Sequence, residues 1–169
     1  KGEKEWQRPE ALSEEVNRPG FHTANPAISE DGRKLYYNRI VLQSQKAVEA
    51  KIYVSDVDDA GWKSGNEVEG INGEYLALQP ALGELFGRDV IFFASDMPGG
   101  YGGMDIYYAT SNGDNSYDEP VNLGAQINTI ADDQMAFYFD GTLYFSTDGL
   151  PTMGGFDVYY SVWNGSEWS

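Results

Sequence analysis

The sequence predicts an all-β protein made of repeated units, because three signatures recur at nearly the same step. An aromatic residue recurs after 56, 55 and 51 positions, at Trp6, Trp62, Tyr117 and Trp168. Two apolar segments repeat with it, first Leu35-Tyr36-Tyr37, Ile91-Phe92-Phe93 and Leu143-Tyr144-Phe145, then Lys51-Ile52-Tyr53-Val54, Asp105-Ile106-Tyr107-Tyr108 and Asp157-Val158-Tyr159-Tyr160. Self-similarity at about 40–55 residues, with several short strands per unit, is typical of β-propeller blades.

The elements of one unit follow in a constant order. Each unit opens on a segment that we align as Asn25-Pro26-Ala27-Ile28, Gln79-Pro80-Ala81-Leu82 and Gln134-Met135-Ala136-Phe137. Proline donates no ladder hydrogen bond, so it suits a strand start or a sheet edge. A turn follows, with Asp31-Gly32 and Asp140-Gly141 as dipeptides that accept positive φ in tight hairpins.

Two more strands and a polar turn complete the unit. The second strands, at 35–38, 90–94 and 143–146, are nearly continuous apolar runs, which suits strands covered on both faces. The third strands are expected at 51–55, 105–109 and 157–161, and the Trp/Tyr segment follows as a fourth. We therefore expect three four-stranded blades, with repeats of about 6–61, 62–116 and 117–167 and a further blade starting at 168. Kelch repeats are the alternative, but their Gly-Gly ends the second strand, whereas here it precedes the third.

Three blades leave two sheet faces open, and propellers close with four to eight blades. The expectation is therefore a segment of a larger ring of six to eight blades, completed by a longer polypeptide or by a second copy.

Composition restricts the classes of function. The 169 residues carry a formal charge of −16 and no Cys, which disfavours nucleic-acid binding and removes thiolate chemistry. No run of about 18 apolar residues is present, so no direct membrane span is expected. The acidic surface is read as a source of solubility, with a basic partner or divalent cations as the alternative.

A glycine-aspartate loop separates the second and third strands in two of the units. It places Gly102, Gly103, Asp105 and Tyr107 in one unit, and Gly154, Gly155, Asp157 and Tyr159 in the next. Glycines allow tight backbone, and Asp accepts the N–H groups that such a loop leaves unpaired. The first unit departs from this pattern, because Ile40 to Lys51 contains no glycine and Lys51 replaces the Asp.

These motifs carry a family resemblance. The block from Pro26 to Tyr37 and the segment Gly103-Met104-Asp105-Ile106-Tyr107 resemble the PD40 repeat, a WD40-like propeller repeat found in TolB and in OmpA-family envelope proteins. The fuller glycine loop, with Leu123-Gly124-Ala125-Gln126-Ile127-Asn128-Thr129, is similar to OmpA-family lipoproteins associated with type IX secretion. The resemblance implies a periplasmic, outer-membrane-associated setting, with envelope proteins as partners. Peptidoglycan would be bound only through a domain that this sequence does not contain.

Catalytic and metal chemistry have few candidates. The carboxylates Asp96, Asp105, Asp148 and Asp157 are weak candidates for a Ca²⁺ site or a glycosidase pair. Their recurrence favours turn stabilisation, because a catalytic pair is needed once. The segments 56–59 and 114–116 lack full calcium-loop spacing. His22, the one histidine, is read as a polar residue at a strand start. No cofactor is expected.

Two hypotheses about function follow. The first is a non-enzymatic protein-interaction scaffold of the cell envelope, with the divergent segment Ile40 to Lys51 as its contact. The alternative is a carbohydrate-binding or glycoside-processing propeller that uses Asp96, Asp148 and aromatic side chains at its mouth.

Overall fold

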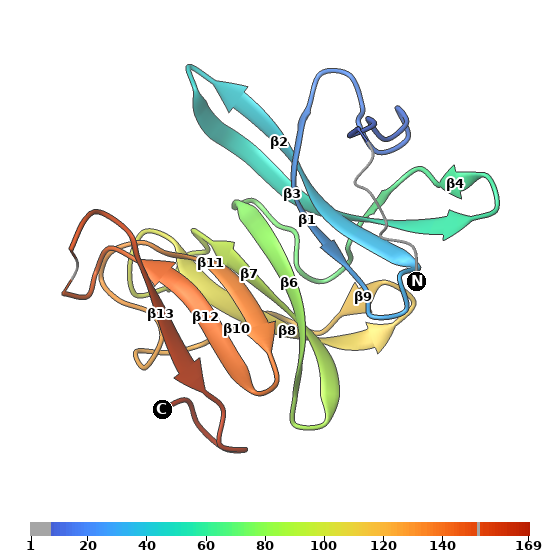
Figure 1. Cartoon of the computed structure of the whole chain (residues 1–169). Coiled ribbons are helices and arrows are strands. Elements are labelled where there is room, and N and C mark those ends of the chain that lie inside the picture. The colour runs from blue at the N-terminus through green and yellow to red at the C-terminus, as the bar shows by residue number, and fades with distance from the viewer. Residues whose placement is uncertain (1–7, 152) are drawn as a thin grey trace.

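The computed structural model describes residues 8–151 and 153–169, and the chain in these ranges is all-β. It forms thirteen strands and no helix there. Within the same ranges, no helical segment has the length and apolar character needed to cross a bilayer. Figure 1 shows the strands grouped into successive sheets in chain order, from blue to red. The predicted all-β class is therefore confirmed.

The strands form three antiparallel sheets. Sheet 1 holds β1 (His22–Ile28), β2 (Lys34–Gln43), β3 (Lys46–Asp58), β4 (Gly61–Trp62) and β5 (Asn66–Glu67). Sheet 2 holds β6 (Ala77–Leu85), β7 (Arg88–Ser95), β8 (Asp105–Gly113), β9 (Ser116–Tyr117) and β10 (Val121–Asn122). Sheet 3 holds β11 (Asp133–Phe139), β12 (Thr142–Thr147) and β13 (Asp157–Val162).

The sheets thus hold five, five and three strands among the described residues, rather than four each. The difference lies in the expected fourth strand, which is split into two short strands in sheets 1 and 2. Trp62 pairs with Val57 and Tyr117 pairs with Ser111, each beyond a hairpin turn from the third strand. Trp168 makes the corresponding bridge to Trp163, although no named strand continues from it. Trp6, the first residue of this signature, lies outside the described residues.

A bulge near the middle of the first strand repeats in all three sheets. Its residue with positive φ is Asn25, Gln79 and Met135 in turn, with φ of 52°, 57° and 58°. The pairing register shifts at each of these positions. The structure therefore aligns Met135 with Asn25 and Gln79, and corrects by one residue the alignment that the sequence suggested. The prolines of the first two units correspond to Ala136 in the third.

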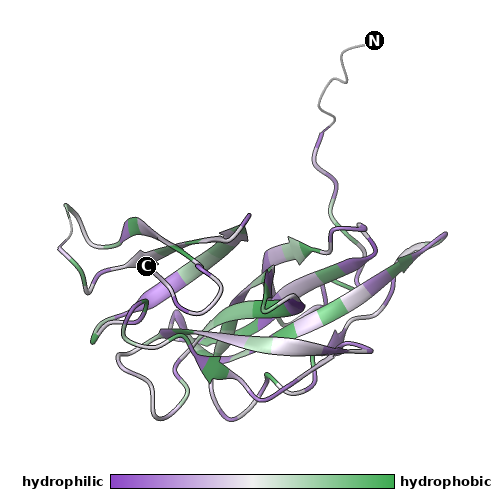
Figure 2. Ribbon diagram, turned by 90° about the horizontal axis from the view of Figure 1, so that it is seen from below, coloured by the Kyte–Doolittle hydropathy of each residue, from purple (hydrophilic) through white to green (hydrophobic). Residues whose placement is uncertain are grey.

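The sheets pack face to face through their aromatic second strands. Tyr36 and Ile52 of sheet 1 pack with Phe93 of sheet 2 in one buried cluster. The other face of sheet 2, with Phe92, packs against Phe145 of sheet 3 in a second cluster. Hydrophobic residues accordingly gather along the strands in Figure 2, with hydrophilic ones at the turns. Alternating faces of one strand thus serve two interfaces, as the continuous apolar runs predicted.

The outer face of sheet 3 is open. Tyr144 occupies the position of Tyr36 and Phe92 in the repeat but is 41% exposed, against 5% and 0% for those two residues. Its neighbours Phe137 and Tyr160 are 60% and 68% exposed, with ring centroids 6.3 and 6.2 Å from that of Tyr144. An apolar patch of this kind on a sheet face marks a contact surface.

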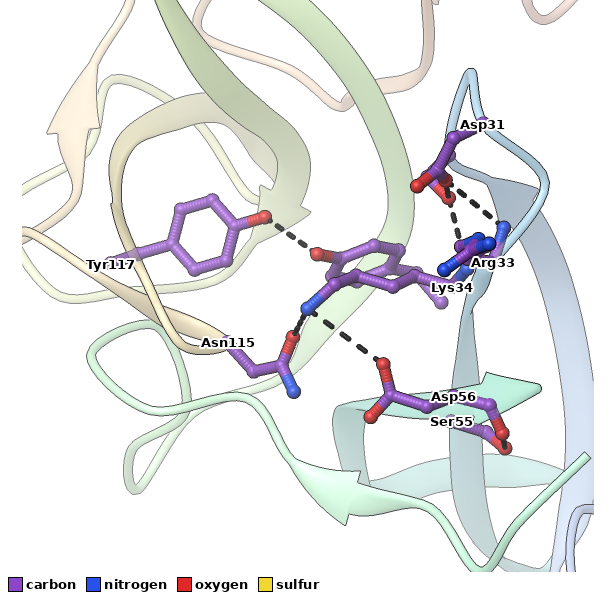
Figure 3. A network of polar contacts seen from close by, with 9 residues as sticks. Asp31, Arg33, Lys34, Ser55, Asp56, Asn115 and Tyr117 are labelled. Atoms are coloured by element: carbon purple, nitrogen blue, oxygen red, sulfur yellow. Dashed lines mark hydrogen bonds and ion pairs between the residues drawn. The ribbon is translucent and has the colours of Figure 1, made fainter. Parts of the chain in front are cut away.

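Sheets 1 and 2 are also joined by a polar contact at one end of their interface. The hydroxyl groups of Tyr36 and Tyr117 lie 3.1 Å apart and are buried. The Lys34 ammonium donates to Asn115 and lies 3.8 Å from an oxygen of Asp56 (Figure 3). Burial raises the pKa of both tyrosines, so the pair favours the neutral phenols.

Candidate functional site

The glycine loop of sheet 2 is built around Asp105. Its carboxylate, 1% exposed, accepts hydrogen bonds from the backbone N–H groups of Tyr101 and Gly102, at 2.5 and 3.1 Å. The Asn122 side chain donates a third, at 3.0 Å. The Tyr107 hydroxyl donates to the Met97 carbonyl oxygen at 3.3 Å. Asp105 and Tyr107 therefore hold the loop in place.

This loop covers the chain segment that leads into sheet 3. Gly103 N–H donates to the Ala131 carbonyl at 3.0 Å, and Met104 N–H donates to the Asp132 carboxylate at 2.9 Å. A Cβ atom on Gly102 would lie 1.9 Å from the Ala131 oxygen. Glycine is therefore required at this position, because no side chain fits between the loop and the segment.

Among the residues that the structure describes, no such loop covers the equivalent segment between sheets 1 and 2. There, β2 and β3 continue pairing beyond Arg39 and Lys51 to a tip at Ser44 and Gln45, whose φ values are 50° and 66°. The divergent segment is thus an extended hairpin rather than a covering loop. The space that it leaves open is the candidate site.

The open space is a cavity of about 360 Å³ beside the hairpin of β2 and β3, where sheets 1 and 2 meet. Its walls come from the hairpin, from the segment before β6 and from the end of β7. The lining residues are Val48, Glu49, Lys51, Glu74, Tyr75, Leu76 and Asp96. Three exposed acidic residues, one lysine and one tyrosine therefore line a space large enough for a small ligand.

Backbone contacts fix the segment that carries Glu74 and Tyr75. Lys51 Nζ donates to the Gly73 carbonyl. Asn72 bonds both the N–H and the carbonyl of Ile52, at 2.9 and 2.8 Å. Burial raises the pKa of Tyr75, with smaller contributions from Tyr107 and Glu119. Tyr75 thus presents a neutral phenol ring at the cavity wall.

Asp96 and Asp148, both proposed from the sequence, occupy equivalent positions. Asp96 accepts the Leu76 N–H at 2.7 Å, and Asp148 accepts the Asp132 N–H at 3.0 Å. Each carboxylate thereby anchors the segment that enters a first strand. Only Asp96 also lines the cavity, so the structure separates the two residues that the sequence treated alike.

The glycine loop of sheet 3 follows that of sheet 2 in part. Asp157 accepts the Met153 N–H, and the Tyr159 hydroxyl donates to the Pro151 carbonyl at 2.5 Å. Cβ atoms on Gly154 and Gly155 would meet no atom within 4 Å. These glycines are therefore not required by close packing within the described structure, in contrast to Gly102.

Asp133 was not singled out by the sequence. It is fully buried at the start of β11 and accepts Thr129 N–H and Oγ–H at 2.5 and 3.1 Å. Its Oδ1 has no hydrogen-bond partner among the described atoms. Burial raises its pKa more than the nearby Thr147 and Thr129 groups lower it. Its place in the repeat is taken by Ala77 in sheet 2, so no periodic signal marks it.

The metal candidates do not assemble into a site. Among residues 8–151 and 153–169, no group of three or more His, Cys, Asp or Glu side chains is placed to hold a metal ion. Asp56 and Asp58 lie 3.8 and 3.5 Å from Lys34 and Lys63 instead. His22 begins β1 and is exposed.

Comparison with solved structures supports the propeller fold. The crystal structure of α-L-arabinofuranosidase from Lactobacillus brevis matches with a TM-score of 0.56 at 14% identity, over 88% of this chain and 52% of that chain. A thermostable family-43 glycoside hydrolase matches with a TM-score of 0.49 at 14% identity, over 88% of this chain and 56% of that one. The chain therefore spans about half the length of these enzymes. Both are β-propeller glycoside hydrolases.

The comparisons correct the first hypothesis about function. No family model and no curated protein matches the chain. The structural likeness is to glycoside hydrolases, not to OmpA-family or secretion proteins, so the predictions of a non-enzymatic envelope scaffold and of no enzymatic role are wrong on this finding. The resemblance to PD40 repeats, the periplasmic location and the envelope partners stay predictions that no comparison tests.

Proposed function

We propose that the protein binds saccharides, as part of a glycoside-processing β-propeller, in the cavity between sheets 1 and 2. The observation that carries the proposal is the cavity itself, lined by Glu49, Glu74, Asp96 and the ring of Tyr75. The hydroxyl groups of a sugar donate hydrogen bonds to carboxylate oxygens, and its apolar C–H faces pack on aromatic rings. The α-L-arabinofuranosidase that shares this fold supports the same class of ligand.

The carboxylates also suit hydrolysis. A glycosidase needs one carboxyl group that protonates the leaving oxygen and a second that activates water or attacks the sugar. Glu74 and Asp96 come from two different elements that face one cavity. We assign them as the pair. Asp96 is held by its hydrogen bond from Leu76 N–H, while Glu74 is carried by the segment that Lys51 tethers.

A binding and hydrolysis screen tests the proposal. Purified protein is tested by calorimetry and by release of reducing sugar against arabino-, xylo-, gluco-, galacto- and manno-oligosaccharides. Glu74→Gln should abolish hydrolysis and leave the fold intact. Glu84→Gln, the same change at an exposed position on β6 outside the cavity, should leave activity unchanged. Absence of both binding and hydrolysis across the panel would refute the proposal.

We further propose that the three sheets are successive blades of a larger ring. Tyr36 and Phe92 are covered by the next sheet, and Tyr144 is the same position on a face that is not covered. The repeated packing supports a further sheet of the same kind on that face. Small-angle scattering of a variant with one more repeat appended should show a curved, closing shape; an extended, detached repeat would contradict it.

A further inference from the structure

We propose that the cavity selects uncharged saccharides and rejects uronates, an inference that rests on the saccharide-binding function proposed above. The selectivity follows from the net charge of the residues that line the cavity. Three of the lining residues, Glu49, Glu74 and Asp96, are acidic, and Lys51 is the one basic residue among those lining it. The net charge of the residues that line the cavity is therefore negative before any ligand enters.

The single ammonium group already gives one of its three donors to the protein backbone. Lys51 Nζ donates to the Gly73 carbonyl oxygen, in the chain segment that carries Glu74 and Tyr75. At the equivalent position in sheets 2 and 3 the repeat has Asp105 and Asp157, whose carboxylates bind backbone N–H groups of their own loops. Each of these charged side chains thus makes a hydrogen bond to a nearby backbone group. In sheet 1 this group is a carbonyl oxygen, and in sheets 2 and 3 the groups are N–H donors.

Tyr75 supplies a surface for an uncharged ring. Gly73 and Tyr75 form a β-bridge, and a Cβ atom on Gly73 would lie 2.3 Å from the Tyr75 ring. The ring is therefore seated directly against the backbone that Lys51 holds. This arrangement makes Lys51 a positioning residue for Tyr75, in addition to the one positive charge that it contributes to the cavity wall.

A uronate adds a fourth carboxylate to this cavity. Like charges within a few ångströms repel one another, and the repulsion at a partly exposed site falls as salt screens it. The protein's overall charge of −16 acts in the same direction at longer range. We therefore expect uronates to bind at least tenfold more weakly than the matching neutral sugars at low salt, with the difference narrowing as ionic strength rises.

Calorimetry with matched ligand pairs tests the inference on the intact chain. The pairs are oligosaccharides of gluco, galacto and manno configuration and the corresponding uronates, at 20 mM and 300 mM salt. The expected result is binding of at least one neutral ligand, with its uronate at least tenfold weaker at low salt. Uronate binding equal to or tighter than that of its neutral partner would overturn the selectivity while leaving saccharide binding intact. Failure of every ligand here and of the arabino- and xylo-oligosaccharides named above would overturn the saccharide-binding function, and the selectivity with it.

Three variants separate the roles of the charges. Glu49→Lys should raise uronate affinity at least fivefold relative to neutral ligand, because it reverses one wall charge. Lys51→Met should weaken neutral ligands at least fivefold and uronates further, because a positive wall charge is also lost, and it should speed hydrogen exchange of residues 72–76. Lys51→Arg, which keeps a donor for the Gly73 carbonyl, should restore both. A loss confined to the uronate in Lys51→Met would show that Lys51 is a ligand counter-ion, contrary to the inference.

Discussion

At the scale of single residues, two buried polar sites in this protein depend on very few hydrogen-bond partners. Tyr36 and Tyr117 join two sheets through one hydroxyl–hydroxyl contact of 3.1 Å. Asp133 keeps one oxygen bonded and the other without a partner among the described atoms. Because each such group depends on one or two contacts, single substitutions there have effects that can be measured and assigned.

Replacing Tyr117 with phenylalanine should lower the free energy of unfolding by about 1–2 kcal/mol, because the Tyr36 hydroxyl is left buried without its partner. Urea denaturation of this variant, of Tyr36→Phe and of the double variant forms a mutant cycle. The double variant should lose less than the sum of the two single losses. Strict additivity would show that the two hydroxyls do not interact.

The same pair predicts a response to alkaline pH. Burial raises the pKa of Tyr117, followed by interaction with Tyr36, so folding favours the protonated phenol. The stability that this shift contributes is fully present below about pH 10, the pKa of an unfolded tyrosine. It is lost as pH rises from there through the folded-state pKa. Tyr117→Phe should therefore flatten the decline in stability above pH 10; an unchanged decline would contradict the assignment.

We expect the ionisation of Asp133 to make folding stability fall with rising pH as well, in the acid range. Its folded-state pKa is raised by burial, so its contribution to stability is present below the unfolded pKa of about 3.9 and is lost as pH rises through the folded value. Asp133→Asn mimics the protonated acid and should stabilise the protein near pH 7 by roughly 1 kcal/mol. Thermal unfolding at pH 4 and pH 7 measures it, and Asp59→Asn is the control at an exposed carboxylate.

At the scale of elements, the glycine loop of sheet 2 covers the interface with sheet 3, whereas the equivalent segment of sheet 1 leaves its interface with sheet 2 uncovered. The loop of sheet 2 lies on residues 129–132, whereas the hairpin of β2 and β3 leaves residues 73–76 uncovered. The repeat therefore differs in the one place where a ligand cavity forms. Variation in loops on a constant frame is how such frames acquire binding sites.

Gly102 and Gly154 test this difference directly. They hold the same position in the repeat, yet a Cβ atom at Gly102 would lie 1.9 Å from a backbone oxygen, while at Gly154 it would meet nothing within 4 Å. Gly102→Ala should cost about 1–3 kcal/mol, as overpacking does, and should increase proteolysis of the loop. Gly154→Ala should change stability by less than about 0.5 kcal/mol. Equal effects would show that the loop does not pack on residues 129–132.

At the scale of the whole molecule, the three sheets are stacked through equivalent faces, and the stack is covered differently at its two ends. The outer side of sheet 1 is closed by Val16, which is buried with Leu35 and Tyr37. The outer side of sheet 3 has no such cover among the described residues, and Tyr144, Phe137 and Tyr160 are exposed there. Removing the aromatic ring at the same repeat position should therefore lower the free energy of unfolding by different amounts in successive sheets.

Phe92→Ala should lower the free energy of unfolding by about 3–5 kcal/mol, because it empties a fully buried site. Tyr144→Ala, at the same repeat position, should cost less than about 1 kcal/mol in the chain alone. Chemical denaturation at low protein concentration measures both. A cost for Tyr144→Ala close to that of Phe92→Ala would show that the outer face of sheet 3 is covered in solution.

Much of this organisation was predictable, and the misses have physical causes. The second and third strands were located from Leu35, Ile91 and Leu143 and their partners, because buried strands need apolar side chains on both faces. The one-residue error at Met135 arose because the bulge position takes Asn25, Gln79 or Met135, which share backbone φ but no side-chain chemistry. The cavity was missed because its residues come from three elements. The sequence marked the segment Ile40 to Lys51 and Asp96 separately, and no local pattern placed Glu74 and Tyr75 beside them.

The amino-acid sequence by itself determined the all-β class and the repeating strand pattern, since hydrophobic periodicity and turn residues act over a few neighbouring positions. It also marked Asp105 and Lys51 as equivalent positions with opposite charge. Only the tertiary structure decided what that exchange means, namely that Lys51 binds the Gly73 carbonyl and an uncovered cavity lies beside it. Such a site depends on which segments distant in sequence are brought together, and that is settled by the packing of whole sheets.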